Sequence, residues 1–249
     1  MESGTDDQDR PRDAELSDSQ SAAGLRRWVD FPASLDPRPI VCLGGPILCR
    51  GFTTGEAKGA FLMGVIDAAG DVPDEPVRYL RQGRGHRGFN VGQPLRVLRA
   101  TNAEAAFPTD RGPHMLPAWR VEAEDALEPI WVLGDDARRR CWSSPSEPAE
   151  GWPHAGYPVW GAVVDGDDLG LSVDFTGGLH SLFRYELVTL ESETAVVVVT
   201  IQKLVRPTEG SIFIPRRGDP HRGRVRLKQP LGARVVVNMD ASPVSVTRG

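Results

Sequence analysis

Alternating hydrophobic and polar positions dominate the second half of the chain and predict antiparallel β-strands. We expect two hairpins, with strands at 157–164 and 169–175 and at 184–190 and 194–204. The turn Asp165-Gly166-Asp167-Asp168 joins the first pair, and its Asp-Gly step tolerates positive φ. The run 195–201 is apolar on both faces, which predicts a central strand. Three further strands are expected at 224–227, 234–237 and 244–246.

The first half has weaker patterns. We expect a short strand pair at 40–43 and 46–52, around two glycines, and neighbouring strands at 119–121 and 130–133. Between them, Thr53 or Thr54 can cap a helix that runs to about Gly70. Repeating β-α-β units would need helices of about ten or more residues between the strands. The sequence therefore predicts an α+β protein that is mostly β, with antiparallel sheets and one or two short helices.

A segment rich in proline, glycine and serine at 143–158 is the expected internal boundary. We expect an acidic tail at 1–27, an N-terminal α+β region at 28–145 and a C-terminal antiparallel β region at 146–249. The alternative is that the last two regions form one continuous domain, since 249 residues are compatible with either organisation.

The net charge of -5 comes from the start of the chain. Residues 1–24 carry seven acids against two arginines, and we expect this tail to be disordered. It lacks the basic start and apolar run of an export signal, so we expect a cytoplasmic protein. The longest apolar run, 195–199, is far shorter than the roughly 20 residues of a membrane-spanning helix.

The chain has three cysteines, Cys42, Cys49 and Cys141, and no C-x-x-C pair. An odd number of this kind predicts buried or idle thiols in a reducing compartment. A Cys42/Cys49 disulfide or a thiolate nucleophile is the alternative.

Residues 83–88, GRGHRG, match the spacing of a dinucleotide-binding loop. The residues that follow, FNVGQP, cannot begin the regular helix that receives the pyrophosphate, so we expect no nucleotide cofactor. Arginines are dense between 78 and 99, but the chain after its tail is neutral, and we do not expect nucleic-acid binding. The five histidines are scattered without metal-ligand spacing, so no metal is predicted.

Residues 107–120 hold the densest set of functional side chains. The candidate ligand-binding residues are Asp110, Arg111, His114, Trp119 and Arg120. Arginine offers a bidentate fork to an anion, and tryptophan offers a stacking face. The alternative is structural: 109–112 is a turn in which the aspartate bonds its own backbone, and Leu116, Trp119 and Val121 feed the core.

Two series of short motifs follow each other along the chain: TDRG, LPAW, PIWVL and RCW at 109–142, then DFTGG, ESETAVVVV and VRLKQPLGARVVV at 174–237. Their combination and order resemble a group of proteins from high-GC bacteria to which no activity is assigned. The resemblance covers about 107–246, and many members look exported or lipid-anchored. Those members carry cysteines where this chain has 179–181 and 211–213, without cysteine. A cytoplasmic member would lose both cysteines together.

These patterns favour a non-catalytic β-rich binding or interaction protein whose partner is a protein or a small molecule. The alternative is a hydrolase-like enzyme that uses Asp110 and His114 with a serine. Catalysis would require these side chains to converge in one pocket.

Overall fold

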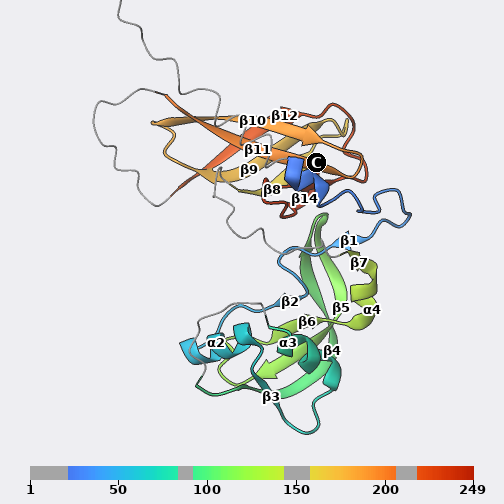
Figure 1. Ribbon diagram of the computed structural model, residues 1–249, viewed down its shortest axis with the longest axis vertical. Helices are drawn as coiled ribbons and strands as arrows, with labels where there is room; N and C mark the ends of the chain where they lie inside the picture. Colours follow the sequence, from blue (N-terminus) through green and yellow to red (C-terminus); the bar gives the residue numbers. More distant parts are fainter. Residues whose placement is uncertain (1–21, 84–91, 143–157, 206–217) are drawn as a thin grey trace, which may run out of the picture. The chain divides into compact units, whose positions relative to one another are not determined.

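The computed structural model describes residues 22–83, 92–142, 158–205 and 218–249 (Figure 1). The chain divides into two compact units. Unit 1 contains residues 1–41, 110–112 and 143–249, and unit 2 contains residues 42–109 and 113–142. Residues 28–41, expected in the N-terminal region, thus cluster with the C-terminal strands. The acidic tail to residue 21, the glycine motif after Gly83 and the boundary segment 143–157 lie outside the described residues.

Unit 1 is built from two sheets. Its strands are β1 (Ile40–Val41), β8 (Val159–Val164), β9 (Gly170–Gly177), β10 (Phe183–Glu191), β11 (Ala195–Leu204), β12 (Asp219–Arg226), β13 (Val235–Val237) and β14 (Val246–Arg248). One sheet has the order β12-β9-β8-β14, the other has the order β10-β11-β13, and β1 lies in neither of them. The pairs β8/β9, β9/β12 and β10/β11 are antiparallel, whereas β14 and β13 join their neighbours in parallel.

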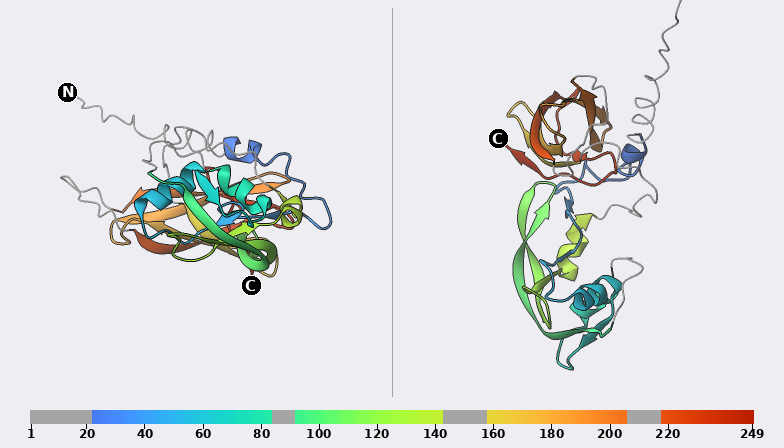
Figure 2. Two further views of the ribbon diagram at one scale, coloured as in Figure 1. Left: turned by 90° about the horizontal axis from the view of Figure 1, so that it is seen from below. Right: turned by 90° about the vertical axis from the view of Figure 1, so that its left-hand side faces the viewer.

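The two sheets of unit 1 enclose one hydrophobic core (Figure 2). Alternate side chains of β8 and β9 point into it, together with valines of β11 and β13. Both hairpins predicted from the sequence are confirmed. The run 195–200 is buried at every position, because β11 lies between β10 and β13 and is covered on both faces.

Unit 2 combines one sheet with short helices. Its elements are β2 (Ile47–Leu48), α2 (Gly55–Met63), β3 (Ile66–Ala68), α3 (Asp74–Arg81), β4 (Leu95–Thr109), β5 (Gly112–Ala123), β6 (Ile130–Leu133), α4 (Asp135–Arg140) and β7 (Cys141–Trp142). The sheet has the order β2-β6-β5-β4-β3. Ala60 and Phe61 of α2 and Val77 and Leu80 of α3 pack on it in one buried cluster.

The helix predicted after residue 53 exists but ends earlier than expected. Thr54 caps α2, since its Oγ1 accepts a hydrogen bond from the amide of Ala57 at 3.1 Å. Gly64 then adopts φ 70°, the left-handed conformation that ends helices, and β3 follows at once. The expected extension to Gly70 was therefore wrong.

Further differences concern the first half of the chain. The short strand pair around Gly44-Gly45 was wrong, because β2 pairs with β6. Helices α3 and α4 and the long strand β4 were not predicted. In α3 only Pro76, Val77 and Leu80 are buried, and three such residues in a polar sequence do not form a clear helical pattern. The fold class is confirmed: the chain is α+β, mostly β, with mostly antiparallel sheets.

Within the described ranges, no helix is both long and apolar enough to cross a membrane.

Candidate functional site

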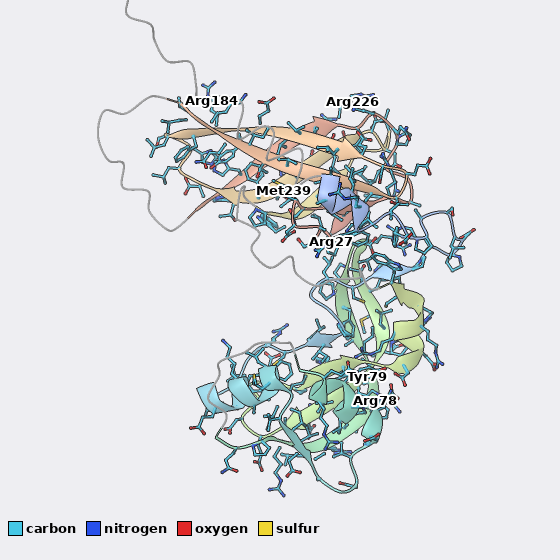
Figure 3. The ribbon with its side chains drawn as sticks, viewed as in Figure 1. Arg27, Arg78, Tyr79, Arg184, Arg226 and Met239 are labelled. Atoms are coloured by element: carbon cyan, nitrogen blue, oxygen red, sulfur yellow. The ribbon has the colours of Figure 1, made fainter. Side chains whose placement is uncertain are left out.

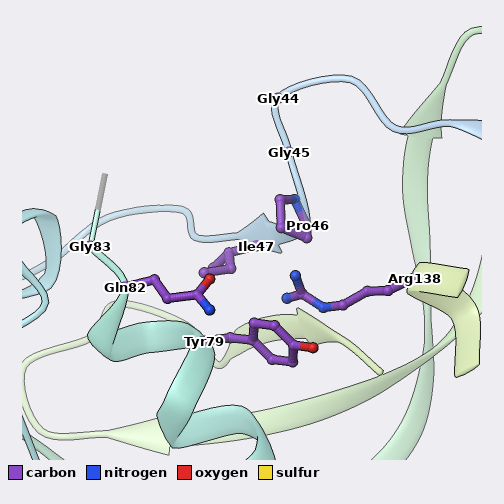
Figure 4. Close-up of a pocket in the computed structure, with 8 residues that line it drawn as sticks. All are labelled: Gly44, Gly45, Pro46, Ile47, Tyr79, Gln82, Gly83 and Arg138. Atoms are coloured by element: carbon purple, nitrogen blue, oxygen red, sulfur yellow. The ribbon is translucent and has the colours of Figure 1, made fainter. Parts of the chain in front are cut away.

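A pocket of about 300 Å³ lies in unit 2 where the loop before β2, the end of α3 and α4 meet (Figure 4). Its lining residues are Gly44, Gly45, Pro46, Ile47, Tyr79, Gln82, Gly83 and Arg138. Gly44 and Gly45 form one side of the pocket. Their φ angles are 73° and 86°, a region that residues with side chains rarely adopt. The chain turns sharply there and leads directly into β2.

Arg138 supplies the positive charge of the pocket. Its Nε donates to the carbonyl oxygen of Leu133 at 2.8 Å, and its Cζ lies 3.3 Å from the centroid of the Tyr79 ring. Its Nη2 is buried and has no hydrogen-bond partner among the described residues. Burial lowers the pKa of Arg138 below the ordinary value of a guanidinium group. The pocket thus contains a guanidinium donor, Nη2, that no residue in the described part of the chain satisfies.

Tyr79 is held in place by its hydroxyl group. This group donates a short hydrogen bond to Oδ1 of Asp135, at the start of α4. Arg78 is the neighbour of Tyr79 on α3 (Figure 3). It donates to Oδ2 of the same carboxylate at 3.0 Å. The hydrogen bond from Tyr79 is the main cause that lowers the pKa of Asp135. The carboxylate thus fixes the ring on which Arg138 stacks.

A second contact joins the two helices. The amide of Asp135 donates to Oε1 of Glu75 at 2.7 Å, so a side chain of α3 satisfies one amide at the N-terminal end of α4. Together with the bonds from Tyr79 and Arg78, this contact sets the position of α4 relative to α3. These contacts therefore also set the distance between Arg138 and Gln82, which line the same pocket.

The composition of the pocket suits a small organic anion. A guanidinium offers paired N–H donors to a carboxylate or phosphate group. The Gln82 side chain adds an amide, while Pro46 and Ile47 provide apolar surface. Few polar groups on a mainly apolar wall are typical of small-molecule sites.

The structure places the first two sequence-predicted residues within unit 1. Asp110 is buried: its Oδ2 lies 2.6 Å from Nη2 of Arg38, and its Oδ1 accepts from the amide of Val41 at 3.0 Å. Arg111 donates to the carbonyl oxygens of Arg38 and Pro39 at 2.9 and 3.1 Å. The turn at 109–112 exists. The sequence suggested that its aspartate bonds its own backbone, but the side chain of Asp110 instead bonds Arg38 and Val41. Both side chains hold the segment before β1.

The other three predicted residues lie in unit 2 on β5. Nδ1 of His114 is 3.1 Å from Oγ1 of Thr109. Trp119 packs against the hydrophobic cluster of unit 2, and Arg120 forms an ion pair with Glu122. The structure gives Asp110 and His114 different partners and does not bring the five residues into one pocket.

The outward arginines of β12 are neutralised within unit 1. Arg222 lies 2.6 Å from Asp174, and Arg226 lies 3.3 Å from Asp167. Arg224 pairs with Asp165, in the same acidic turn as Asp167. These arginines are mostly exposed, but each has a carboxylate partner and none is available as an unpaired phosphate ligand. Within the described parts of the chain, no group of three histidine, cysteine or acidic side chains is placed to hold a metal ion.

Sequence reasoning did not find Tyr79 or Arg138. Both belong to short polar helices, DEPVRYLR and DDARRR, in which an arginine resembles any solvated helical charge. Their partnership spans α3 and α4, and no short motif encodes a contact over that separation. The doubled glycine at 44–45 was noted only as a turn.

Comparison of the chain with protein-family models, with curated proteins and with solved structures found no match. The resemblance to the high-GC bacterial group stays a prediction, and the assignment of function rests on the geometry.

Proposed function

We propose that this is a non-catalytic binding protein and that unit 2 receives a small organic anion, with a carboxylate or phosphate group, in the pocket beside Arg138. The observation that carries the proposal is the buried Nη2 of Arg138, which has no partner in the described part of the chain. An unsatisfied buried donor costs about 1–3 kcal/mol, and more when it is charged. An anionic ligand would offset that cost.

The aromatic partner supports the same conclusion. Stacking on Tyr79 holds the guanidinium plane and reduces the side-chain entropy that binding would cost. Asp135, the nearest carboxylate of the network, is already engaged by Tyr79 and Arg78. Among the described residues, no carboxylate therefore takes up the Nη2 donor of Arg138.

The loop at 110–120 is a weaker candidate for the same role. Arg111 and Arg120, its two arginines, donate to groups of the chain itself. A ligand at this loop would have to displace those contacts. The binding function predicted from the sequence is thus retained, and its site is moved from the loop to the pocket.

Native mass spectrometry of the intact protein, purified gently from its own host, tests the proposal. We expect a stoichiometric added mass of a small anion, and its loss in Arg138→Gln. Arg139→Gln is the matched control, because Arg139 is the next residue of α4 and pairs only with the exposed Asp136. Titration with inorganic phosphate and with succinate, followed by calorimetry, then compares the three proteins.

Loss of binding in Arg138→Gln but not in Arg139→Gln supports the pocket. Equal binding in both variants, or no added mass and no heat for either anion, contradicts it. Circular dichroism of each variant separates loss of binding from loss of folding.

The hydrolase alternative stays a prediction, and the separate partners of Asp110 and His114 do not favour it. The cytoplasmic location also stays a prediction, which fractionation of host cells would test.

A further inference from the structure

Two cysteines that are far apart in the sequence lie side by side in unit 2. The sulfurs of Cys42 and Cys141 are 3.4 Å apart, although 99 positions separate the residues. Both residues are half-buried. The sulfur of Cys49 lies instead 3.9 Å from the carbonyl oxygen of Gly51. The geometry therefore selects one pair of thiols out of three.

The backbone holds both members of the pair. Cys42 forms an isolated antiparallel bridge with Thr109, and the amide of Leu43 donates to the carbonyl oxygen of Pro108 at 2.8 Å. Cys141 directly follows α4, and its amide donates to the carbonyl oxygen of Arg138. Because both main chains are tied to regular elements, the approach of the sulfurs is a property of the fold of unit 2.

We propose that Cys42 and Cys141 are a redox-active pair that a low-molecular-weight disulfide oxidises to an intramolecular disulfide. One thiolate attacks a sulfur of the small disulfide and expels one small thiolate. The second protein thiolate attacks the resulting mixed disulfide, forms the Cys42–Cys141 bond and expels the other small thiolate. The protein loses two electrons and two protons, and the small disulfide becomes two thiols. The sulfurs must close from 3.4 Å to about 2.05 Å.

The bond would close most of unit 2 into a loop, because Cys42 begins the unit and Cys141 lies one residue before its end. A closed loop of this length restricts the unfolded chain and raises stability. Gly44 and Arg138, which line the pocket, lie within three residues of the two cysteines. The disulfide would also fix the positions of Gly44 and Arg138 on two sides of the pocket. The importance of this effect for binding rests on the proposed function, but formation of the disulfide does not.

Peptide mapping of the full chain tests the pair without any ligand. We expect oxidised glutathione to produce a disulfide-linked peptide that contains Cys42 and Cys141, which dithiothreitol reverses, and to leave Cys49 as a thiol. We also expect oxidation to raise the Tm of unit 2 by about 5 °C or more. Absence of that peptide, or cross-links to Cys49 in similar yield, overturns the proposal.

Single variants test whether both thiols are needed. Cys42→Ser and Cys141→Ser should each lose the linked peptide and the rise in Tm on oxidation, whereas Cys49→Ser should behave as the unchanged protein. A rise in Tm that persists in either of the first two variants overturns the proposal. Mapping of the unchanged protein needs no variant, so it tests the disulfide even if a substitution prevents folding.

Discussion

The guanidinium of Arg38 lies 2.6 Å from the carboxylate of Asp110, and the side chains of the two residues are 9% and 0% exposed. Asp110 also accepts a hydrogen bond from the amide of Val41, and its carbonyl oxygen accepts one from the amide of Val246. A residue that the sequence presented as a candidate for ligand binding is thus a buried junction between β1, the 110–112 turn and β14. Burial with a full set of partners indicates a structural role.

Removal of that carboxylate should destabilise unit 1. Asp110→Ala leaves the charge of Arg38 buried without its partner, and we expect a loss of about 3–5 kcal/mol in the free energy of unfolding. Urea denaturation followed by tryptophan fluorescence measures it. Glu128→Ala is the control, because Glu128 pairs with Arg50 on the exposed surface, where ion pairs contribute about 0–1 kcal/mol. A similar small change in both variants would contradict the structural role.

Glu191 should make stability depend on pH. Burial alone would raise the pKa of its carboxyl, but hydrogen bonds from the Lys228 amide and from Arg234 outweigh burial, so the pKa lies below its ordinary value. A depressed pKa stabilises the fold at pH values above about 4.3, the unfolded value. This stabilisation is lost as the pH falls through the lower folded value.

The comparison of Glu191→Gln with the unchanged protein tests this effect. We expect the variant to have a lower Tm at pH 7, and we expect the difference to shrink towards zero as the pH falls below about 4. Glu193→Gln, two residues away on the exposed turn, is the matched control and should show no such trend. A Tm difference that stays constant from pH 7 to the acid limit would sink the assignment.

Gly64 should tolerate no side chain. Its φ of 70° strains any other residue, and an added Cβ would collide with the carbonyl oxygen of Arg81 at the end of α3. We expect Gly64→Ala to destabilise unit 2 by about 2 kcal/mol or more. Gly55→Ala is the control: this glycine begins α2, and an added Cβ meets nothing within 4 Å.

Hydrogen exchange of the β4 and β5 amides reports the stability of unit 2 in these two variants. We expect faster exchange in Gly64→Ala and unchanged exchange in Gly55→Ala. Equal protection in both would show that the close approach of α2 and α3 is not required.

The ring and the hydroxyl of Tyr79 should contribute separately. Tyr79→Phe keeps the face on which Arg138 stacks and removes the hydrogen bond to Asp135, so we expect a loss of about 1 kcal/mol in stability and retained anion binding. Tyr79→Leu removes the face as well and should weaken binding. Calorimetric titration with the anion that binds the unchanged protein distinguishes the two variants; equal affinity in both would exclude a role for stacking.

Local patterns were sufficient where a strand alternates and a turn follows. The hairpins β8/β9 and β10/β11 follow directly from apolar positions at a period of two and from acidic turns between them. The sequence also predicted a cap at Thr53 or Thr54, because capping depends on residues three apart, and the structure shows that Thr54 is the cap. The end of α2 could not be predicted, because the sequence does not distinguish Gly64 from Gly59. Only the backbone shows that Gly64 is left-handed and that Gly59 is helical.

The sequence by itself determined that this chain is mostly β and that residues 195–200 of β11 are buried on both faces. Each of these properties depends on composition or on residues within one turn or hairpin. Only the tertiary structure decided which side chains meet: Asp110 with Arg38, Cys42 with Cys141, and Arg138 with Tyr79. These pairs join segments separated by tens of residues, and packing of whole sheets and helices, rather than local propensity, sets their positions.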